Sequence, residues 1–305
     1  MSQGRPGTTL RAAVFDLFDT LIAPPPEPAW RALAAAHGYA ADSPVELWLR
    51  RGLICAPLLE NAPALIPALR DAALVTPCAT AEDLAGLATS LGGEPGPRAI
   101  ATVRAAAALV RAESRLAPGA DHVLERCRAL GLATAIVSNV DGLSAGVIDQ
   151  LGLLARLSVP PVTSCNRRAR KPAPALFAHA AAALGVAPAD CVMIGDNWKS
   201  DVVGALRAGM ASIWLWGGDP IAARLATGQL AELTEPGAPA RFRAAYAEVI
   251  AGYLPIAPAA ALAGDLACLA RAHVADDLAE VAGLLAVLLE PPGGADDRAS
   301  LASLE

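Results

Sequence analysis

Apolar runs of strand length alternate with helical patterns along much of this chain. Residues 12–18 form a largely continuous apolar run, which predicts a strand buried on both faces. Further runs between 116 and 215 are separated by helical patterns, and they read LATAIVSN, LSVPPVTS, DCVMIGD and ASIWLW. Strands that alternate with helices predict right-handed crossovers and a parallel sheet. The pattern therefore predicts an α/β fold with a doubly wound parallel sheet.

The stretch from about 28 to 115 shows helical patterns only. APPPEP at 23–28 blocks regular structure after the first strand. Ser43 and Thr80 each precede a helical pattern that has an acid in its first turn, which is a typical N-cap signal. We therefore expect a small bundle of helices inserted after the first strand.

These changes of pattern set the expected domain boundaries. Residues 1–22 and 116–305 would form the α/β core, and residues 23–115 a helical cap. A second insert at about 217–272 has predicted helices without a chemical motif, and HVADDLAEVAGLLAVLL at 273–289 is typical of a final strand and helix.

Composition narrows the class of protein. The chain has 305 residues, 54% of them hydrophobic and 18% charged, with a net charge of −6, so a large core is expected and binding to nucleic acid or acidic membranes is not. The six cysteines lie far apart without metal-ligand spacing, which predicts free thiols in a reducing compartment. Since no signal peptide or membrane span is evident, we expect a soluble cytoplasmic protein that acts on a small molecule, in an oligomeric state left open.

The basic residues are strongly biased toward arginine. Lys171 and Lys199 are the only lysines among 24 basic residues. A lysine kept against this bias is expected where a compact ammonium is needed rather than a planar guanidinium.

Polar side chains follow the predicted strands where the strands end. Asp16 follows AAVF, Ser138 and Asn139 follow ATAIV, the basic loop NRRARK follows the third run, and Asp196 follows CVMIG. Carboxyl ends of parallel strands meet at one edge of a sheet, so these groups are expected to converge there. Two acids, a hydroxyl and a lysine at one edge indicate a metal and a charged substrate.

Four stretches in this order resemble the motifs of the haloacid dehalogenase superfamily of hydrolases, which have a Rossmann-like core. They read VFDLFDTL, IVSN, RKPAP and IGDNWKSD, the last followed by GALRAGM, and they cover about 12–22 and 116–215. The helical insert lies where this family has its cap domain. The resemblance implies a hydrolase, most simply a phosphatase that works through an aspartyl-phosphate.

The resemblance also assigns roles to individual residues. Asp16 would be the nucleophile, and Thr20 would steady the group that is transferred. Ser138 would donate a hydrogen bond to the phosphoryl oxygens, with Asn139 beside it in contact with substrate. Lys171 would neutralise charge on the nucleophile and on the phosphoryl group.

A Mg²⁺ site is implied as well. Its ligands would be the carboxylates of Asp16 and Asp196 and the backbone carbonyl of Phe18, with Asp201 supporting the metal or the lysine. On the cap, Arg50 is a candidate substrate contact, and Arg51 is a neighbouring one.

Position 18 departs from the pattern of the phosphatases. They carry a second aspartate two residues after the nucleophile as general acid and base, and this chain has Phe18 there. Asp19 is a possible replacement, although strand alternation would direct it away from Asp16. The dehalogenases of the family carry an aromatic residue at this position, but they dispense with Mg²⁺ and with the acid that Asp196 provides.

Three readings therefore stay open. The first is a Mg²⁺-dependent phosphatase with atypical acid/base chemistry, the second is a metal-independent 2-haloacid dehalogenase, and the third is a catalytically weak homologue that binds a phosphorylated ligand. The family's phosphonate-cleaving enzymes use a cap lysine, and residues 21–115 contain none. Two serines of these motifs also have a purely structural interpretation: Ser138 could cap the next helix, and Ser200 could be an N-cap.

Overall fold

A computed structural model describes residues 10–215 and 271–289. Its main sheet has six parallel strands in the order β5-β4-β1-β6-β7-β8. Their bounds are Ala12–Phe15 for β1, Ala133–Ser138 for β4, Val162–Thr163 for β5, Cys191–Gly195 for β6, Ala211–Leu215 for β7 and Ala272–Ala275 for β8. The doubly wound α/β fold predicted from the sequence is confirmed.

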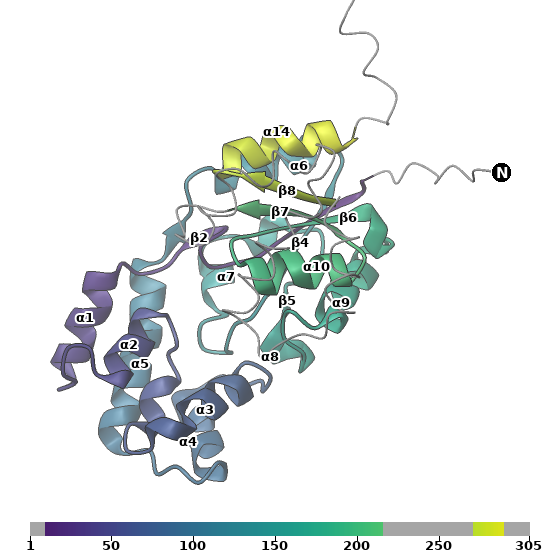
Figure 1. Cartoon of the computed structure of the whole chain (residues 1–305). Coiled ribbons are helices and arrows are strands. Elements are labelled where there is room, and N and C mark those ends of the chain that lie inside the picture. The colour runs from purple at the N-terminus through teal and green to yellow at the C-terminus, as the bar shows by residue number, and fades with distance from the viewer. Residues whose placement is uncertain (1–9, 216–270, 290–305) are drawn as a thin grey trace, which may run out of the picture.

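Helices cover both faces of this sheet. On one face lie α6 (Ala120–Ala129) and α14 (Leu278–Leu289), and on the other lie α9 (Pro174–Leu184) and α10 (Gly204–Arg207) (Figure 1). In β1, β4 and β6 neighbouring residues enter different cores: Phe15 of β1 lies in the core that includes α6 and α14, and Val14 in the core that includes α9 and α10. A strand buried on both faces has to be apolar at every position, which explains the continuous apolar runs.

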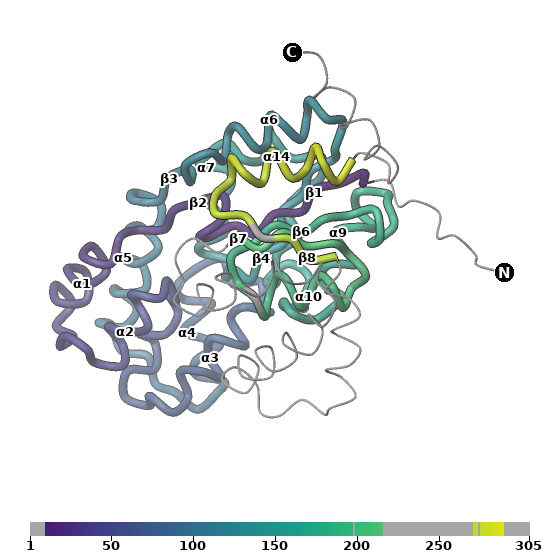
Figure 2. The backbone as a smooth tube through the Cα atoms, turned by 45° about the horizontal axis from the view of Figure 1, so that its top comes forward, coloured from purple at the N-terminus to yellow at the C-terminus, as the bar shows by residue number. Residues whose placement is uncertain are grey.

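The residues between the short strands β2 and β3 form a separate group of helices. They are α1 (Glu27–Ala36), α2 (Pro44–Arg50), α3 (Ile66–Ala73), α4 (Ala81–Ser90) and α5 (Pro97–Glu113). We call this group the cap; it lies to one side of the sheet in both views (Figures 1 and 2). The chain enters it through β2 (Ile22–Ala23) and leaves through β3 (Arg115–Leu116), which pair antiparallel.

The predicted capping signals act as the sequence suggested. The side chain of Thr80 accepts from the backbone N–H of Asp83, and Asp83 accepts in return from the N–H of Thr80, so α4 begins with a complete capping box. Ser43 accepts from the N–H of Glu46 at the start of α2. The carboxylate of Glu46 accepts from the N–H of Asp42.

Some elements differ from their predicted extent. In the predicted helix after β4 only Val147–Gln150 is helical, as α7, and the stretch after β5 becomes the short helix α8 (Ser164–Arg167). The predicted helix at 199–209 begins as a π-helical turn over Trp198–Val203 and continues as α10. Asn197, not Ser200, caps that turn, since its side chain accepts from the N–H of Ser200.

The second insert expected at about 217–272 lies mostly outside the described residues. The final strand and helix expected at 273–289 are β8 and α14. Among the described helices, none combines the length and apolarity needed to cross a bilayer.

Candidate active site

Side chains from three neighbouring strands meet at the carboxyl edge of the sheet. Asp16 follows β1, Ser138 ends β4 and Asp196 follows β6. Because β1 lies between β4 and β6 and all three run parallel, the ends of these strands come side by side. This edge faces the cap and is the expected place for a ligand in an open α/β sheet.

Lys171 lies inside this group. Its ammonium donates to Oδ1 of Asp16 and to Oδ1 of Asp201, each at 2.6 Å, and its side chain is only 2% exposed. Burial by itself would lower the pKa of Lys171, but the charges and hydrogen bonds of the two aspartates outweigh it and raise the pKa. The lysine therefore remains protonated.

Three carboxylates form a potential cation site. Asp16, Asp196 and Asp201 each present an oxygen, and these oxygens lie within 4.8 Å of one another. Desolvation, together with the charges of Asp16 and Asp201, raises the pKa of Asp196 to about 8. Three carboxylates facing one lysine crowd negative charge, which raises this pKa, and a hard divalent cation with oxygen ligands fits this donor set.

Asp201 is the most heavily engaged of the three acids. Its Oδ1 accepts from Lys171, and its Oδ2 accepts from the backbone N–H of Asn197 at 2.9 Å. It also lies so close to β6 that a Cβ on Gly195 would come within 2.3 Å of its carboxylate. The lack of a side chain at Gly195 therefore leaves room for the carboxylate of Asp201. Because this carboxylate is held by the N–H of Asn197, it is suited to fixing the ammonium of Lys171.

The chain turns sharply after Asp16. β1 ends at Phe15, three residues earlier than predicted, and the N–H groups of Leu21 and Ile22 both donate to the carbonyl of Leu17. Asp19 has a φ of 59°, a left-handed conformation that aspartate tolerates better than most residues. Because β1 ends before Asp19, strand alternation does not determine the direction of its side chain.

Phe18 and Asp19 both line a pocket between the cap and the core. Desolvation in this pocket and the charge of Asp16 raise the pKa of Asp19. The carbonyl of Phe18, the remaining candidate metal ligand, belongs to the same turn. Phe18, at the position where the family's phosphatases carry an acid, and Asp19, its possible replacement, thus both line the pocket.

Two hydroxyl-bearing residues complete the edge of the sheet. Thr20 is fully buried, and its Oγ1 has no hydrogen-bond partner among the described residues. Ser138 is 3% exposed at the end of β4, opposite Thr163. Ser138 is not needed as a helix cap, since Asp141 accepts from the N–H groups of Leu143 and Ser144.

The pocket has a volume of about 320 Å³, which is near the lower limit for small-molecule sites. Its walls come from the turn after β1, the loop after β4 and the cap. They include apolar side chains of Phe18, Trp30, Leu53, Leu74, Val110 and Val140, and polar ones of Asp19, Asn139, Asp141 and Ser144.

Three of these pocket residues, Trp30, Asp141 and Ser144, were not predicted from the sequence. Asp141, just after IVSN and before a glycine, carries a recognisable capping signal, whereas Trp30 reaches the pocket only through the packing of the cap.

The cap arginines differ in their surroundings. Arg50 lines the pocket, but its guanidinium pairs with carboxylates of the cap: Glu27 at 2.9 Å, Asp42 at 3.3 Å and Glu46 at 2.7 Å. Arg51 also lines the pocket and forms no ion pair within the described part of the chain. Among the described residues, Arg51 is therefore the one of the two whose charge is not paired.

The basic loop before Lys171 reaches the cap. Arg170 pairs with Asp71 of α3, which Arg70 also contacts. Partial burial would raise the pKa of Asp71, but the hydrogen bonds from the two arginines lower it. Arg167 and Arg168 are exposed at the end of α8. Of these three arginines, only Arg170 forms an ion pair with the cap in the part of the chain that the structure describes.

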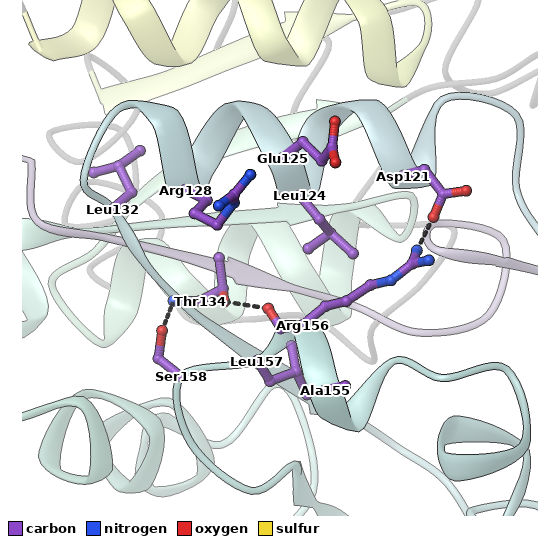
Figure 3. Close-up of a pocket in the computed structure, with 10 residues that line it drawn as sticks. All are labelled: Asp121, Leu124, Glu125, Arg128, Leu132, Thr134, Ala155, Arg156, Leu157 and Ser158. Atoms are coloured by element: carbon purple, nitrogen blue, oxygen red, sulfur yellow. Dashed lines mark hydrogen bonds and ion pairs between the residues drawn. The ribbon is translucent and has the colours of Figure 1, made fainter.

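A second cavity of about 550 Å³ lies far from this chemistry. It opens between α6 and the start of β4, at the amino end of that strand (Figure 3). Arg156 points across its mouth to Asp121, while Thr134 bonds to Arg156 and Ser158 (Figure 3). Its polar groups are largely paired with each other, so it is not the candidate site.

The described cysteines show no role in the site. Cys55, Cys78, Cys127, Cys165 and Cys191 are free and buried, and Cys268 lies outside the described residues. Burial raises the pKa of the thiols, for example that of Cys191 to about 11, so they stay protonated near neutral pH.

Comparison with known proteins identifies the family. The model of the haloacid dehalogenase-like hydrolases matches residues 10–209. A phosphoserine phosphatase of Thermus thermophilus is 37% identical over 101 residues, covering 33% of this chain and 40% of that protein. An N-acylneuraminate-9-phosphatase of Rattus norvegicus is 44% identical over 55 residues, 18% of this chain and 22% of that protein. The chain thus spans less than half the length of these relatives.

One of the solved structures that match this chain is the L-2-haloacid dehalogenase from Xanthobacter autotrophicus. It is 21% identical, with 91% of this chain and 98% of that chain covered and a TM-score of 0.49. A likeness of this degree says nothing about the reaction. The family model covers most of the described core, and the parallel sheet with its acidic edge agrees with it. The chain therefore belongs to the haloacid dehalogenase-like hydrolases.

Proposed function

We propose that this hydrolase is a Mg²⁺-dependent phosphatase of small phosphorylated metabolites that works through an aspartyl-phosphate on Asp16. The observation that carries the proposal is the cluster of Asp16, Asp196 and Asp201, in which three carboxylates face a single lysine. Such a cluster would repel a phosphate dianion unless a divalent cation were bound. The relatives named above, a phosphoserine phosphatase and an N-acylneuraminate-9-phosphatase, agree with phosphate chemistry.

Asp16 is placed to act as the nucleophile. Its Oδ1 accepts from Lys171, and Oδ2 accepts no hydrogen bond from the described residues, which leaves Oδ2 for attack on phosphorus. The new oxygen–phosphorus bond forms as the bond to the leaving oxygen breaks, and that oxygen takes its proton from water. A second water then hydrolyses the aspartyl-phosphate, which restores the Asp16 carboxylate and releases inorganic phosphate. Lys171 holds Asp16 in place and offsets the charge of the transferring group.

The rest of the site would bind and orient the phosphoryl group. Ser138 ends β4, and Thr20 follows β1 in the same turn as Phe18; within the described residues Oγ1 of Thr20 has no hydrogen-bond partner, so it would have a hydrogen bond to offer a phosphoryl group. Asp16, Asp196 and the carbonyl of Phe18, supported by Asp201, would hold Mg²⁺, which when bound stabilises negative charge on the phosphoryl oxygens. The small pocket next to them suits a metabolite rather than a macromolecule.

Phe18 favours one competing function. Its ring lines the pocket where phosphatases of the family carry an acid, as in the 2-haloacid dehalogenases, which attack carbon with the same aspartate. The acidic cluster argues the other way, because carbon–halogen cleavage needs no cation. We therefore keep dehalogenation as the alternative.

The deciding experiment measures phosphate release from a panel of small phosphate monoesters, with Mg²⁺ and with excess EDTA, beside halide release from 2-chloropropionate. We expect phosphate release that requires Mg²⁺ and is absent in Asp16→Asn. Phosphate release that persists in EDTA, or halide release in its place, contradicts the proposal. Tight binding of phosphorylated compounds without any turnover contradicts it too, and favours a binding protein.

A further inference from the structure

The backbone of Lys171 is held by a single side chain. Lys171 lies in a turn between α8 and α9, so no helix or strand pairs its peptide groups. Its N–H donates to Oδ1 of Asn139 at 2.7 Å, and its C=O accepts from Nδ2 of Asn139 at 3.0 Å. No other hydrogen bond to this residue's backbone occurs in the described part of the chain. The carboxamide of Asn139 thus forms the two hydrogen bonds that a neighbouring strand would otherwise form with this backbone.

Asn139 is itself well fixed in the fold. It follows β4 directly, and β4 pairs with β1, the strand that leads to Asp16. The next residue, Val140, is tied to α8, since its N–H donates to Oγ of Ser164 at 3.1 Å. Two neighbouring residues of the loop after β4 are therefore bonded to the segment 164–171. Asn139 bonds to the backbone of Lys171, and Val140 bonds to the side chain of Ser164.

We infer that Asn139 is a positioning residue that sets the Lys171 peptide at the distance from which its ammonium reaches both Asp16 and Asp201. This inference rests on the proposed function only where it takes Lys171 to be needed for turnover. A lysine side chain has four flexible methylene groups, so a fixed ammonium requires a fixed backbone. Asn139 supplies that anchor, and Asp16 and Asp201 hold the other end.

This role differs from the substrate contact expected from the sequence. Asn139 does line the pocket, but its oxygen and its nitrogen are both bonded to Lys171. A residue that binds substrate affects KM when it is removed, whereas one that positions Lys171 affects the chemical step. The two roles therefore predict different kinetics.

The test is a double-mutant cycle with Asn139→Ala and Lys171→Ala, using the phosphate ester that the wild type turns over best. We expect Asn139→Ala to lower kcat by about 10- to 100-fold, as a misplaced catalytic group does, with KM within about threefold of wild type. In the Lys171→Ala background the same change should cost almost nothing, because the group that it positions is gone. Losses that multiply in the double variant, or a change confined to KM, overturn the inference.

Two further variants guard against an effect of folding alone. Asn139→Asp keeps the oxygen that accepts from the Lys171 N–H but sets a second acceptor, in place of the donor, against the Lys171 carbonyl, so its kcat should fall at least as far as in Asn139→Ala. A kcat near wild type in Asn139→Asp would contradict the anchoring role. Ser164→Ala removes the adjacent link to Val140 and serves as the matched control, with reduced thermal stability but kcat near wild type. An equal loss of kcat in Ser164→Ala would show that any loosening of these loops suffices, which overturns the specific role.

Hydrogen exchange of the Lys171 amide tests the contact without any assay of activity. We expect this amide to exchange faster by at least tenfold in Asn139→Ala than in Ser164→Ala. If exchange behaves so but no phosphate ester is hydrolysed, the proposed function fails and the contact stands. If phosphate esters are hydrolysed and the cycle is multiplicative, the proposed function stands and the positioning role fails.

Discussion

Lys171 provides the positive charge that Asp16 and Asp201 share, and its shape matters as much as its charge. We expect Lys171→Arg to lower kcat/KM by at least about 100-fold, because a planar guanidinium cannot take the place of an ammonium between two carboxylates 2.6 Å away. Steady-state kinetics on folded protein provide the measurement. The matched control is Lys199→Arg, the same change at the only other lysine, which should behave as wild type. Equal activity of the two variants would contradict a catalytic role for Lys171.

Phe18 makes the reaction depend on the leaving group. General acid and base assistance is typically worth about 10²–10⁴-fold, so without an acid at 18 alkyl phosphates should be poor substrates and p-nitrophenyl phosphate a comparatively good one. We expect Phe18→Asp to raise kcat/KM for an alkyl phosphate more than for p-nitrophenyl phosphate.

Asp19→Asn is the companion variant for this comparison. Asp19 lines the same pocket, and a complete loss of wild-type activity in Asp19→Asn would show that Asp19, not an absent residue at 18, serves as the acid and base. Circular dichroism should accompany both variants, because Phe18→Asp places a charge where a ring packs against the core.

The helices of the cap begin at signals that local sequence provides. Thr80 caps α4 through a reciprocal pair of bonds with Asp83, and we expect Thr80→Ala to lower the free energy of unfolding by about 1 kcal/mol. Urea unfolding followed by circular dichroism is the measurement. Thr89→Ala, at an exposed position late in the same helix, should stay within about 0.5 kcal/mol of wild type. Equal effects of the two changes would show that the box does not stabilise α4.

How far sequence predicts structure differs between elements for physical reasons. The core strands could be predicted because burial on both faces demands apolar residues throughout, as in β1 and β6. The helices of the cap could be predicted from caps such as Thr80. The turn after Phe15 could not, since its geometry depends on the left-handed backbone of Asp19 and not on apolar pattern. The contact of Asn139 with Lys171 joins residues 32 positions apart, and only the folded sheet brings them together.

The cap and the core meet at a point that leaves no room for a side chain. A Cβ on Gly142, in the loop after β4, would lie 1.9 Å from the carbonyl oxygen of Cys78 in the cap. We expect Gly142→Ala to push the cap away and to lower kcat/KM by about tenfold or more, since the pocket between the two parts would widen. Kinetics beside thermal unfolding are the measurement.

Gly146→Ala is the control for this change. Nothing lies within 4 Å of a Cβ at Gly146, which is four residues further along the same segment. Its kinetics should match wild type. If Gly142→Ala also matches wild type, the approach of Cys78 to the core is not needed for turnover.

The scarcity of lysine has a practical consequence for chemical labelling. Only a neutral amine is acylated by an active ester, and Lys171 is 2% exposed and held protonated by two aspartates, whereas Lys199 is partly exposed. A fluorescent ester should therefore attach to Lys199 as the one reactive side-chain amine of the native protein. The dye would lie on the π-helical turn that carries Asp201, where its emission would report on events at the acidic edge of the sheet. Lys171 would be labelled only in molecules that have unfolded. The rate at which a second dye attaches would therefore report on the opening of the native state.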